Sequence, residues 1–368
     1  MRTAKTVQIH RREREVAGRL GRASDLLEAG DLHNALSVAA EAAELAWSTH
    51  CPPALTARAL TMEGTIAIEC GHHEQAMSRL LAGLDLLAGE LSEQAVSAAA
   101  HARFMLGRAN RVCGNYAEAE QALRQALADI EAASGMDADD LVPVLNELGV
   151  TFKYSGKFGE AEHLYRRALS IVEAVRGPEH HDVASLLHNL AGLAHARGDH
   201  HAAAPLARRG LAVRLRSEDD DSFSVTADRA ALAAILIDLG ETEEAEELLT
   251  AILSHYEDLY GPHHYETAIT LHNLGALQYS SGRVDQALVT LERALSAKES
   301  NLGKDHPELA PTLHNLACAQ AKRGRTATAI VTLERCVGLL SGTVAPDHPT
   351  RRASEQRLQE LRSLHKSH

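Results

Sequence analysis

The sequence predicts an all-α fold, a solenoid of about eight helix-turn-helix repeats closed by a C-terminal capping helix. Three ladders of residues, spaced by about 42 positions, predict it. They consist of turn glycines, of alanines five residues after each glycine, and of small residues seven before it. The glycines are Gly30, Gly71, Gly114, Gly156, Gly198, Gly240, Gly282 and Gly324. A period of this length over most of a chain is typical of stacked repeats.

Each ladder has a physical reason in a helical hairpin. A glycine readily adopts the left-handed conformation that ends one helix and reverses the chain. Small residues on both sides of the turn let two antiparallel helices approach closely, and larger apolar residues at helical spacing fill the layers. The chain is 45% hydrophobic but only 3% aromatic, which also favours helix-on-helix packing. One hairpin cannot bury both faces, so neighbours must stack.

The junctions between repeats follow a register of their own, which a histidine marks. We predict that these histidines, His180, His264, His306 and His348, cap or pack the next helix. Pro307 and Pro349 directly follow two of them, where a proline suits the first turn of a helix. The acidic run 218–221 replaces the motif between the fifth and sixth repeats. We therefore predict a superhelix over residues 1–349 and a capping helix with a tail over 350–368.

A five-residue string, Leu-His-Asn-Leu followed by a small residue, recurs in the first helices of three repeats. It begins at Leu187, Leu271 and Leu313, and the sixth repeat has Ala230 and Ala231 in the register of the His-Asn pair. The fold therefore does not require the pair. This makes the His-Asn pair the better candidate for a functional role.

These features resemble the tetratricopeptide repeat family, in which a small residue, a turn glycine, an aromatic such as Tyr116 or Phe158, and an alanine follow in order. The 42-residue period, the His-Pro junctions and the repeated string resemble the longer repeat of kinesin light chains. The resemblance covers roughly residues 15–365, but the chain lacks the long coiled coil of those proteins. It implies a right-handed α-solenoid whose first helices line a concave groove.

The resemblance further implies that an Asn in the place of Asn189, Asn273 or Asn315 bonds the backbone of an extended ligand peptide. An amide can both donate and accept, so it can hold any peptide unit. Basic side chains in the groove would favour carboxylates. The alternative is that each Asn bonds a neighbouring helix. The predicted groove residues are Arg108, Arg111, Asn146, Lys153, Tyr154, His188, Asn189, His195, His272, Asn273, Tyr279, His314, Asn315 and Lys322.

The 22 histidines raise a metal hypothesis. None has the His-x-x-x-His spacing that places two ligands on adjacent turns, so we assign no metal, and His188, His195 and His200 with an adjacent acid remain the open candidates. The chain has no phosphate loop, nucleophile elbow or dinucleotide fingerprint. We therefore predict no catalytic residues and no cofactor, and the balance is against an enzyme.

Charge and cysteine content limit the partners and the compartment. The net charge is −13, and residues 217–260 carry −12 of it, whereas residues 1–22 carry +5. The lack of a basic stripe argues against nucleic acid, and the lack of a long apolar run argues against a membrane span. The N-terminus has no signal-peptide pattern and the five cysteines have no paired spacing, which predicts a cytoplasmic protein. Attraction between the basic start and the acidic segment would favour a homo-oligomer.

The leading functional hypothesis is a non-enzymatic scaffold or adaptor that binds a protein or peptide segment, with acidic groups, in the groove. One alternative is a ligand- or signal-peptide-responsive regulator that acts through a partner protein. A second alternative is a metal-dependent enzyme or accessory factor that uses groove histidines.

Overall fold

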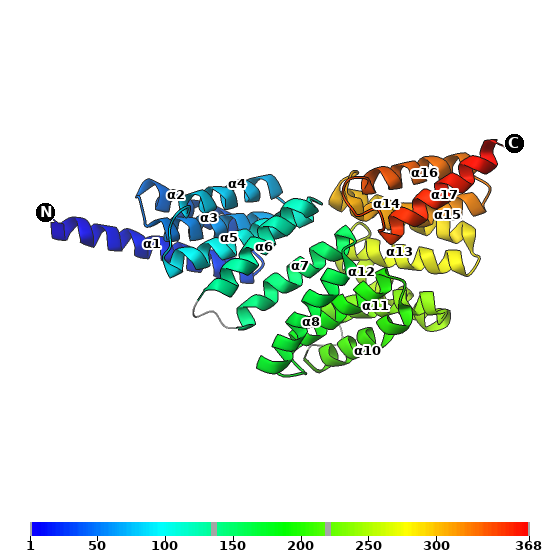
Figure 1. The fold of residues 1–368 in the computed structure, drawn as a ribbon, viewed down its shortest axis with the longest axis horizontal. Helices are drawn as coiled ribbons and strands as arrows, with labels where there is room; N and C mark the ends of the chain where they lie inside the picture. The colour runs from blue at the N-terminus through cyan, green and yellow to red at the C-terminus, as the bar shows by residue number, and fades with distance from the viewer. Residues whose placement is uncertain (1, 134–137, 218–221, 367–368) are drawn as a thin grey trace. The chain divides into compact units, whose positions relative to one another are not determined.

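The computed structural model describes residues 2–133, 138–217 and 222–366, and every regular element within these ranges is a helix (Figure 1). The prediction of an all-α repeat fold is confirmed. The α-helices are α1 (Arg2–Glu28), α2 (Leu32–Ser48), α3 (Pro53–Glu69), α4 (His73–Leu86), α5 (Glu93–Val112), α6 (Tyr116–Ala132), α7 (Leu141–Ser155), α8 (Phe158–Val175), α9 (His181–Ala196), α10 (His200–Ser217), α11 (Phe223–Leu239), α12 (Thr242–Tyr260), α13 (Tyr265–Ser280), α14 (Val284–Leu302), α15 (Ala310–Lys322), α16 (Thr326–Leu340) and α17 (Pro349–Lys366), with short 3-10 helices η1 (Ala138–Asp140) and η2 (Pro307–Leu309).

Consecutive helices form the predicted hairpins, each turning at a ladder glycine. All eight turn glycines have positive φ angles, between 77° and 87°, which a residue with a side chain adopts only with strain. At Gly240, for example, the cap amide bonds the carbonyls of Ile237 and Leu236 and closes the end of α11. The turn ladder is therefore a backbone requirement of the fold.

The small residues before the turns lie where the two helices of a hairpin touch. A Cβ added to Gly275 would lie 2.7 Å from Cγ of Leu291, and one added to Gly107 would lie 2.5 Å from Cγ of Leu123. The alanines after the turns are all completely buried, namely Ala35, Ala76, Ala119, Ala161, Ala203, Ala245, Ala287 and Ala329. Close packing at the turn end thus explains two of the ladders.

The polar segment at the C-terminus forms the predicted closing helix, α17. Its Leu358 and Leu361 are buried against Ala329 and Leu333 of α16, while arginines and glutamates cover its outer side. The last hairpin therefore has a partner for its apolar face and a polar exterior, as an end repeat needs.

The chain divides into two compact units, Met1–Thr151 and Phe152–His368. Within the second unit the two ends meet. The amide of Ala345 donates to the Ser155 carbonyl at 3.1 Å, and the rings of His348 and Phe158 lie 5.9 Å apart. The helices of the second unit therefore turn back on themselves, so that the exposed sides of their first helices face a common interior.

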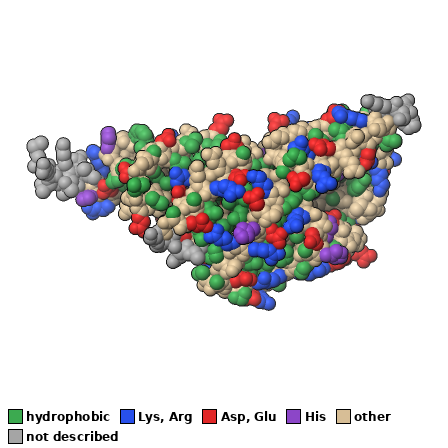
Figure 2. Space-filling view, viewed as in Figure 1, with side chains coloured by type: hydrophobic (Ala, Val, Ile, Leu, Met, Phe, Trp, Pro, Cys, Tyr) green, Lys and Arg blue, Asp and Glu red, His purple; other side chains and the backbone are tan. Residues whose placement is uncertain are grey.

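The described surface has several features that bear on the predictions. The acidic run 218–221 lies outside the described residues, so its proposed role in self-association stays a prediction. Side chains of both charges intermingle on the face in Figure 2.

The five cysteines are free thiols, as expected. No helix in the described ranges is long and apolar enough to cross a membrane.

Candidate functional site

The histidines of the repeated string each contact the next helix of the same layer, which is the first helix of the following repeat or, for His314, the closing helix α17. In all three repeats the ring Nδ1 lies at hydrogen-bond distance from a small polar side chain 40 residues further on. The pairs are His188 with Asp228 at 2.6 Å, His272 with Thr312 at 3.0 Å, and His314 with Ser354 at 2.9 Å. These histidines therefore link the stack, and only their remaining ring edge can serve a ligand.

The partner residues belong to a fourth series with a spacing of 42 residues, which was not recognised from the sequence. Its members, all buried, are Asp228, Thr270, Thr312 and Ser354. In the sixth repeat, where Ala230 replaces the histidine, the Thr270 hydroxyl donates instead to the Glu266 carbonyl of its own helix at 2.9 Å. A search for small polar residues at the repeat spacing would have found this series.

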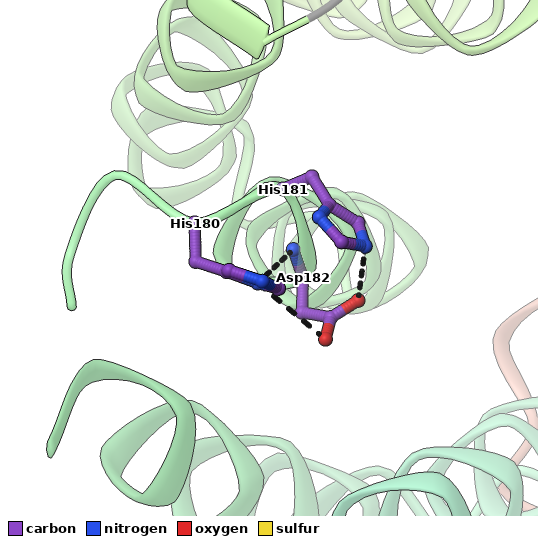
Figure 3. A group of neighbouring side chains, drawn as sticks. All are labelled: His180, His181 and Asp182. Carbon is purple, nitrogen blue, oxygen red and sulfur yellow. Dashed lines mark hydrogen bonds and ion pairs between the residues drawn. The ribbon is translucent and has the colours of Figure 1, made fainter. Parts of the chain in front are cut away.

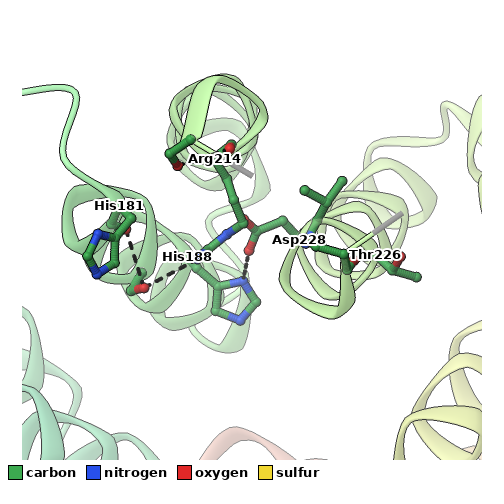
Figure 4. A network of polar contacts seen from close by, with 9 residues as sticks. His181, His188, Arg214, Thr226 and Asp228 are labelled. Atoms are coloured by element: carbon green, nitrogen blue, oxygen red, sulfur yellow. Dashed lines mark hydrogen bonds and ion pairs between the residues drawn. The ribbon is translucent and has the colours of Figure 1, made fainter. Parts of the chain in front are cut away.

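The first of these links is an ionic network in the fifth and sixth repeats (Figure 4). Asp228 accepts from Arg214 Nε at 2.6 Å on one carboxylate oxygen and lies 2.6 Å from His188 Nδ1 on the other. Arg214 also donates to Ser185 at 3.3 Å. Only 8% of the Arg214 side chain and 5% of the Asp228 side chain are exposed, so each charge depends on the other for compensation.

The asparagines of the string differ in what they contact. Asn273 on α13 and Asn315 on α15 are partly buried, and among the described residues neither side-chain amide has a hydrogen-bond partner. Asn189 and Asn146 already interact within the protein. Two equivalent amides on adjacent first helices are thus available for an external partner.

These two amides lie on the partly exposed stripe of their helices. On α13 the stripe runs through Ile269, His272, Asn273 and Ala276, and on α15 it runs through Pro311, His314, Asn315, Cys318 and Lys322. On α9 the stripe includes Gly192, and a Cβ added there would lie 2.8 Å from Nζ of Lys153. Lys153 lies on α7, the first helix of the fourth repeat. The partly exposed stripe of α9 is therefore in contact with a side chain of the preceding first helix.

The predicted basic residues fall into two groups. In the first unit the arginines have acidic partners, because Arg108 pairs with Glu69 at 3.4 Å and Arg111 pairs with Glu147. In the second unit the lysines contact aromatic rings. Lys153 Nζ lies 5.9 Å from the Tyr154 ring centroid, and Lys322 Nζ lies 5.1 Å from that of Tyr279. The lysines are therefore the better candidates to attract a carboxylate.

The interior of the second unit is densely charged. Burial lowers the pKa of Lys153, with the Glu308 carboxylate opposing, and burial likewise lowers the pKa of Lys298, which is 5% exposed. Burial and the nearby Glu308 raise the pKa of Glu266 to about 7. The Tyr265 hydroxyl donates to Glu308, and burial followed by the nearby Tyr154 raises the pKa of that tyrosine. Amines and carboxyls that face the same interior would suit a ligand with both charges, such as a peptide.

Three of the four junction histidines cap the next helix, whereas His348 packs against Phe158 and its buried Nδ1 has no hydrogen-bond partner in the described chain. His180 Nδ1 accepts from the Asp182 amide at 3.3 Å (Figure 3), and the corresponding rings of His264 and His306 accept at 3.3 and 3.2 Å. His181 lies 3.2 Å from the Asp182 carboxylate, but Arg176 pairs with that same carboxylate. Capping and this ion pair account for the group in Figure 3.

The candidate metal ligands are only partly brought together. His195 Nε2 lies 2.5 Å from Asp238 Oδ2, and His200 Nδ1 lies 3.6 Å from the same oxygen. His188 is not part of this group, because its ring contacts Asp228. Asp238, on the first helix of the next repeat, is the adjacent acid that was expected but could not be identified from the sequence.

The first unit has two hollows near its first helices. One, of about 1000 Å³, lies between α5, α6 and the start of α7 and is bordered by Phe104 and Val144. Another, of about 850 Å³, lies along α1, α3 and α5 and is bordered by Arg58 and Met62, and His101 borders both. None of the predicted groove residues lines either hollow.

Comparisons with known proteins agree with this architecture. The family profile described as tetratricopeptide repeat matches residues 97–174, 140–216, 224–300 and 280–341. A search of curated proteins found no match. Among solved structures, a Rap protein complexed with competence and sporulation factor is 13% identical, with 95% of this chain and 98% of that chain covered and a TM-score of 0.62.

Two further solved structures show the range of similarity. The Rap conjugation gene regulator of the plasmid pLS20, in complex with the Phr* peptide, is 13% identical, with 94% of this chain and 96% of that chain covered and a TM-score of 0.59. The kinesin light chain TPR-like repeats of Podosopora anserina are 23% identical, with 56% and 98% covered and a TM-score of 0.40. The two Rap structures show the same fold over nearly the whole chain.

Proposed function

Since the chain belongs to the tetratricopeptide repeat family, we propose that it is a non-enzymatic scaffold or adaptor that binds an extended peptide segment in its second unit. The observation that carries the proposal is the pair of amides on Asn273 and Asn315, which have no hydrogen-bond partner among the described residues. They occupy the same register of adjacent first helices, so one strand of peptide passing over both can use each in turn.

The chemistry of the surrounding side chains supports a peptide as the ligand. Each amide can donate to a backbone carbonyl and accept from a backbone N–H, which holds a peptide independently of its side chains. Lys153, which is partly exposed, would bind a carboxylate of the peptide, and the partly exposed Glu266 and Glu308 would bind an amino group. One protein of the same fold was solved with the Phr* peptide bound, and another was solved with competence and sporulation factor, which agrees with this use of the fold.

The proposal is tested by selecting ligands and then removing the amides. Random peptides of about 12 residues, displayed on phage, are selected against the full chain, and the affinities of the selected peptides are measured by fluorescence polarisation. The double variant Asn273→Ala/Asn315→Ala is expected to weaken binding about 10- to 30-fold, since each lost hydrogen bond contributes about 1 kcal/mol.

The matched control for this experiment is Gln286→Ala, which removes an exposed amide from the outer helix α14 of the same hairpin as Asn273. The affinity of this variant for the selected peptides is expected to equal that of the original chain. If no peptide is selected, or if the double variant and the control bind equally well, the proposal is wrong.

A second candidate is a regulator that responds to a peptide by changing shape. The contacts between the start and the end of the second unit favour it, because a ligand in the interior would act on the Ala345–Ser155 closure. X-ray scattering with and without a selected peptide distinguishes the two. A change in the radius of gyration supports the regulator, and an unchanged curve supports a rigid scaffold.

A further inference from the structure

Histidines lie close to three aspartates on α9 and α11, namely Asp182, Asp228 and Asp238. The carboxylate of Asp238 differs from the other two because no arginine pairs with it among the described residues. Asp182 pairs with Arg176, and Asp228 pairs with Arg214 (Figure 4), so each carboxylate already has a cation. Asp238 has no lysine or arginine partner among the described residues, and the groups near it are two imidazoles. Its charge is therefore the one left for an external cation.

The imidazole of His200 provides a second observation, one that His73 and His348 share but without two other donors beside them among the described residues. Its Nδ1 is buried and has no hydrogen-bond partner in the described chain, and it lies 3.6 Å from Asp238 Oδ2. An unsatisfied buried nitrogen costs free energy that a ligand would recover. The His195 ring lies edge-on to it at 5.4 Å between centroids, with Nε2 2.5 Å from the same oxygen. Three donor atoms thus converge on one point.

The repeats themselves provide the comparison that separates this group from ordinary packing. The residues in the register of His200 in the other repeats are Leu32, His73, Tyr116, Phe158, Thr242, Val284 and Thr326. Those in the register of Asp238 are Glu28, Glu69, Val112, Tyr154, Ala196, Ser280 and Lys322. A histidine or an acid thus recurs in the first two repeats, but no other turn has a histidine in the register of His195. The repeat therefore requires neither residue, and the three donors occur together only in this turn.

We propose that His195, His200 and Asp238 form a divalent metal site, with Zn²⁺ as the best-suited ion. Two imidazole nitrogens and a carboxylate oxygen are a donor set that Zn²⁺ prefers. Tetrahedral donors about 2.0–2.1 Å from the ion are about 3.3 Å apart, so small side-chain rotations bring the three atoms into place. Three protein ligands leave one position for water or a ligand group.

The three side chains are partly exposed to solvent, although the His200 Nδ1 atom itself is buried. The exposed fractions of the three side chains are 30% for His195, 28% for His200 and 43% for Asp238. The donors come from the ends of α9 and α11 and the start of α10. A bound ion would therefore fix the turn of the fifth repeat against the sixth.

The test titrates Zn²⁺ into the full chain, purified without a histidine tag and freed of metal by a chelator, with binding followed by calorimetry. One ion per chain is expected, and His200→Ala and Asp238→Asn are each expected to weaken binding at least about tenfold. The same ion is expected to raise the Tm of the original chain and not that of the two variants. Co²⁺ in place of Zn²⁺ reports four-coordinate geometry through its visible absorption.

The matched control is His201→Ala, which removes an exposed histidine next to the site and is expected to leave affinity unchanged. Circular dichroism confirms that each variant is folded. No saturable binding up to about 100 µM Zn²⁺ would overturn the proposal, because a weaker site adds little stability at ordinary metal concentrations. Equal binding by all the variants would overturn it as well, because the ion would then be bound elsewhere.

Discussion

At the scale of single residues, the two polar side chains of the repeated string have different surroundings. The histidines contact the following helix layer through Nδ1, whereas the amides of Asn273 and Asn315 have no hydrogen-bond partner among the described residues. The sequence marked the pair as dispensable to the fold because one repeat has alanines there. The sequence could not show that the His and the Asn have different surroundings, because the partner of each histidine lies 40 residues away and only packing brings it near.

The Arg214–Asp228 pair gives a stability prediction. Asp228→Ala leaves a buried guanidinium without its carboxylate, so we expect the free energy of unfolding to fall by about 3–5 kcal/mol. Urea unfolding followed by circular dichroism measures it. The control Glu247→Ala removes an exposed acid from the middle of α12 and is expected to change stability by less than about 0.5 kcal/mol. Equal urea midpoints for Asp228→Ala and Glu247→Ala would show that the Arg214–Asp228 pair does not contribute to stability in this way.

His272 gives a prediction of pH dependence. Burial, then Lys298 and His195, lowers the pKa of its imidazole from 6.5 to about 3. The unfolded chain therefore binds a proton that the folded chain does not between these values. This group therefore leaves the free energy of unfolding at its full value above pH 6.5. As the pH falls from 6.5 towards 3, the free energy of unfolding decreases by at most about 1.4 kcal/mol per pH unit.

The test compares the unfolding free energies of the original chain and of His272→Gln at pH 7 and pH 4.5. The original chain is expected to lose more stability on acidification than the variant does. Glu266, whose pKa is raised to about 7, has the opposite effect on stability, because its protonation favours the folded chain as the pH falls. Since Glu266 is present in both proteins, its effect cancels when their losses of stability are compared. Parallel losses would show that His272 is not held neutral.

At the scale of elements, the hairpins were predictable because their requirements are local. A turn needs a positive φ, and two close helices need a small residue, so glycine and alanine recur at a fixed spacing. The ends of elements were less predictable. Pro307, expected in the first turn of a helix, begins a short 3-10 helix before α15. Asp238 was not anticipated as a neighbour of His195, because the repeat period does not tell which way a side chain turns.

Two glycine substitutions test the packing argument with opposite signs. Gly275→Ala places a Cβ 2.7 Å from Leu291 Cγ, and overpacking of this kind costs about 1–3 kcal/mol. Gly338→Ala, within α16, meets nothing within 4 Å and is expected to stabilise the chain by about 0.5–1 kcal/mol through helix propensity. Thermal unfolding of both variants measures the signs. A stabilising Gly275→Ala would contradict close contact at the turn end.

At the scale of the molecule, the described chain forms two compact units, and the ends of the second are joined by the Ala345–Ser155 hydrogen bond. A repeat count predicts neither property, because small changes in the angle between neighbours add up over several hairpins. The closure brings the charged groups of the second unit, such as Lys153 and Glu308, to one interior. The candidate peptide site therefore depends on an arrangement that the sequence alone did not determine.

A peptide that passes over α13 and α15 and bonds the amides of Asn273 and Asn315 can be observed in a crystal structure of the full chain with a peptide selected against it. We expect an extended peptide whose backbone N–H and carbonyl groups lie within about 3 Å of both amides. A peptide bound on the outer helices, or in the hollows beside His101 in the first unit, would contradict this mode of binding.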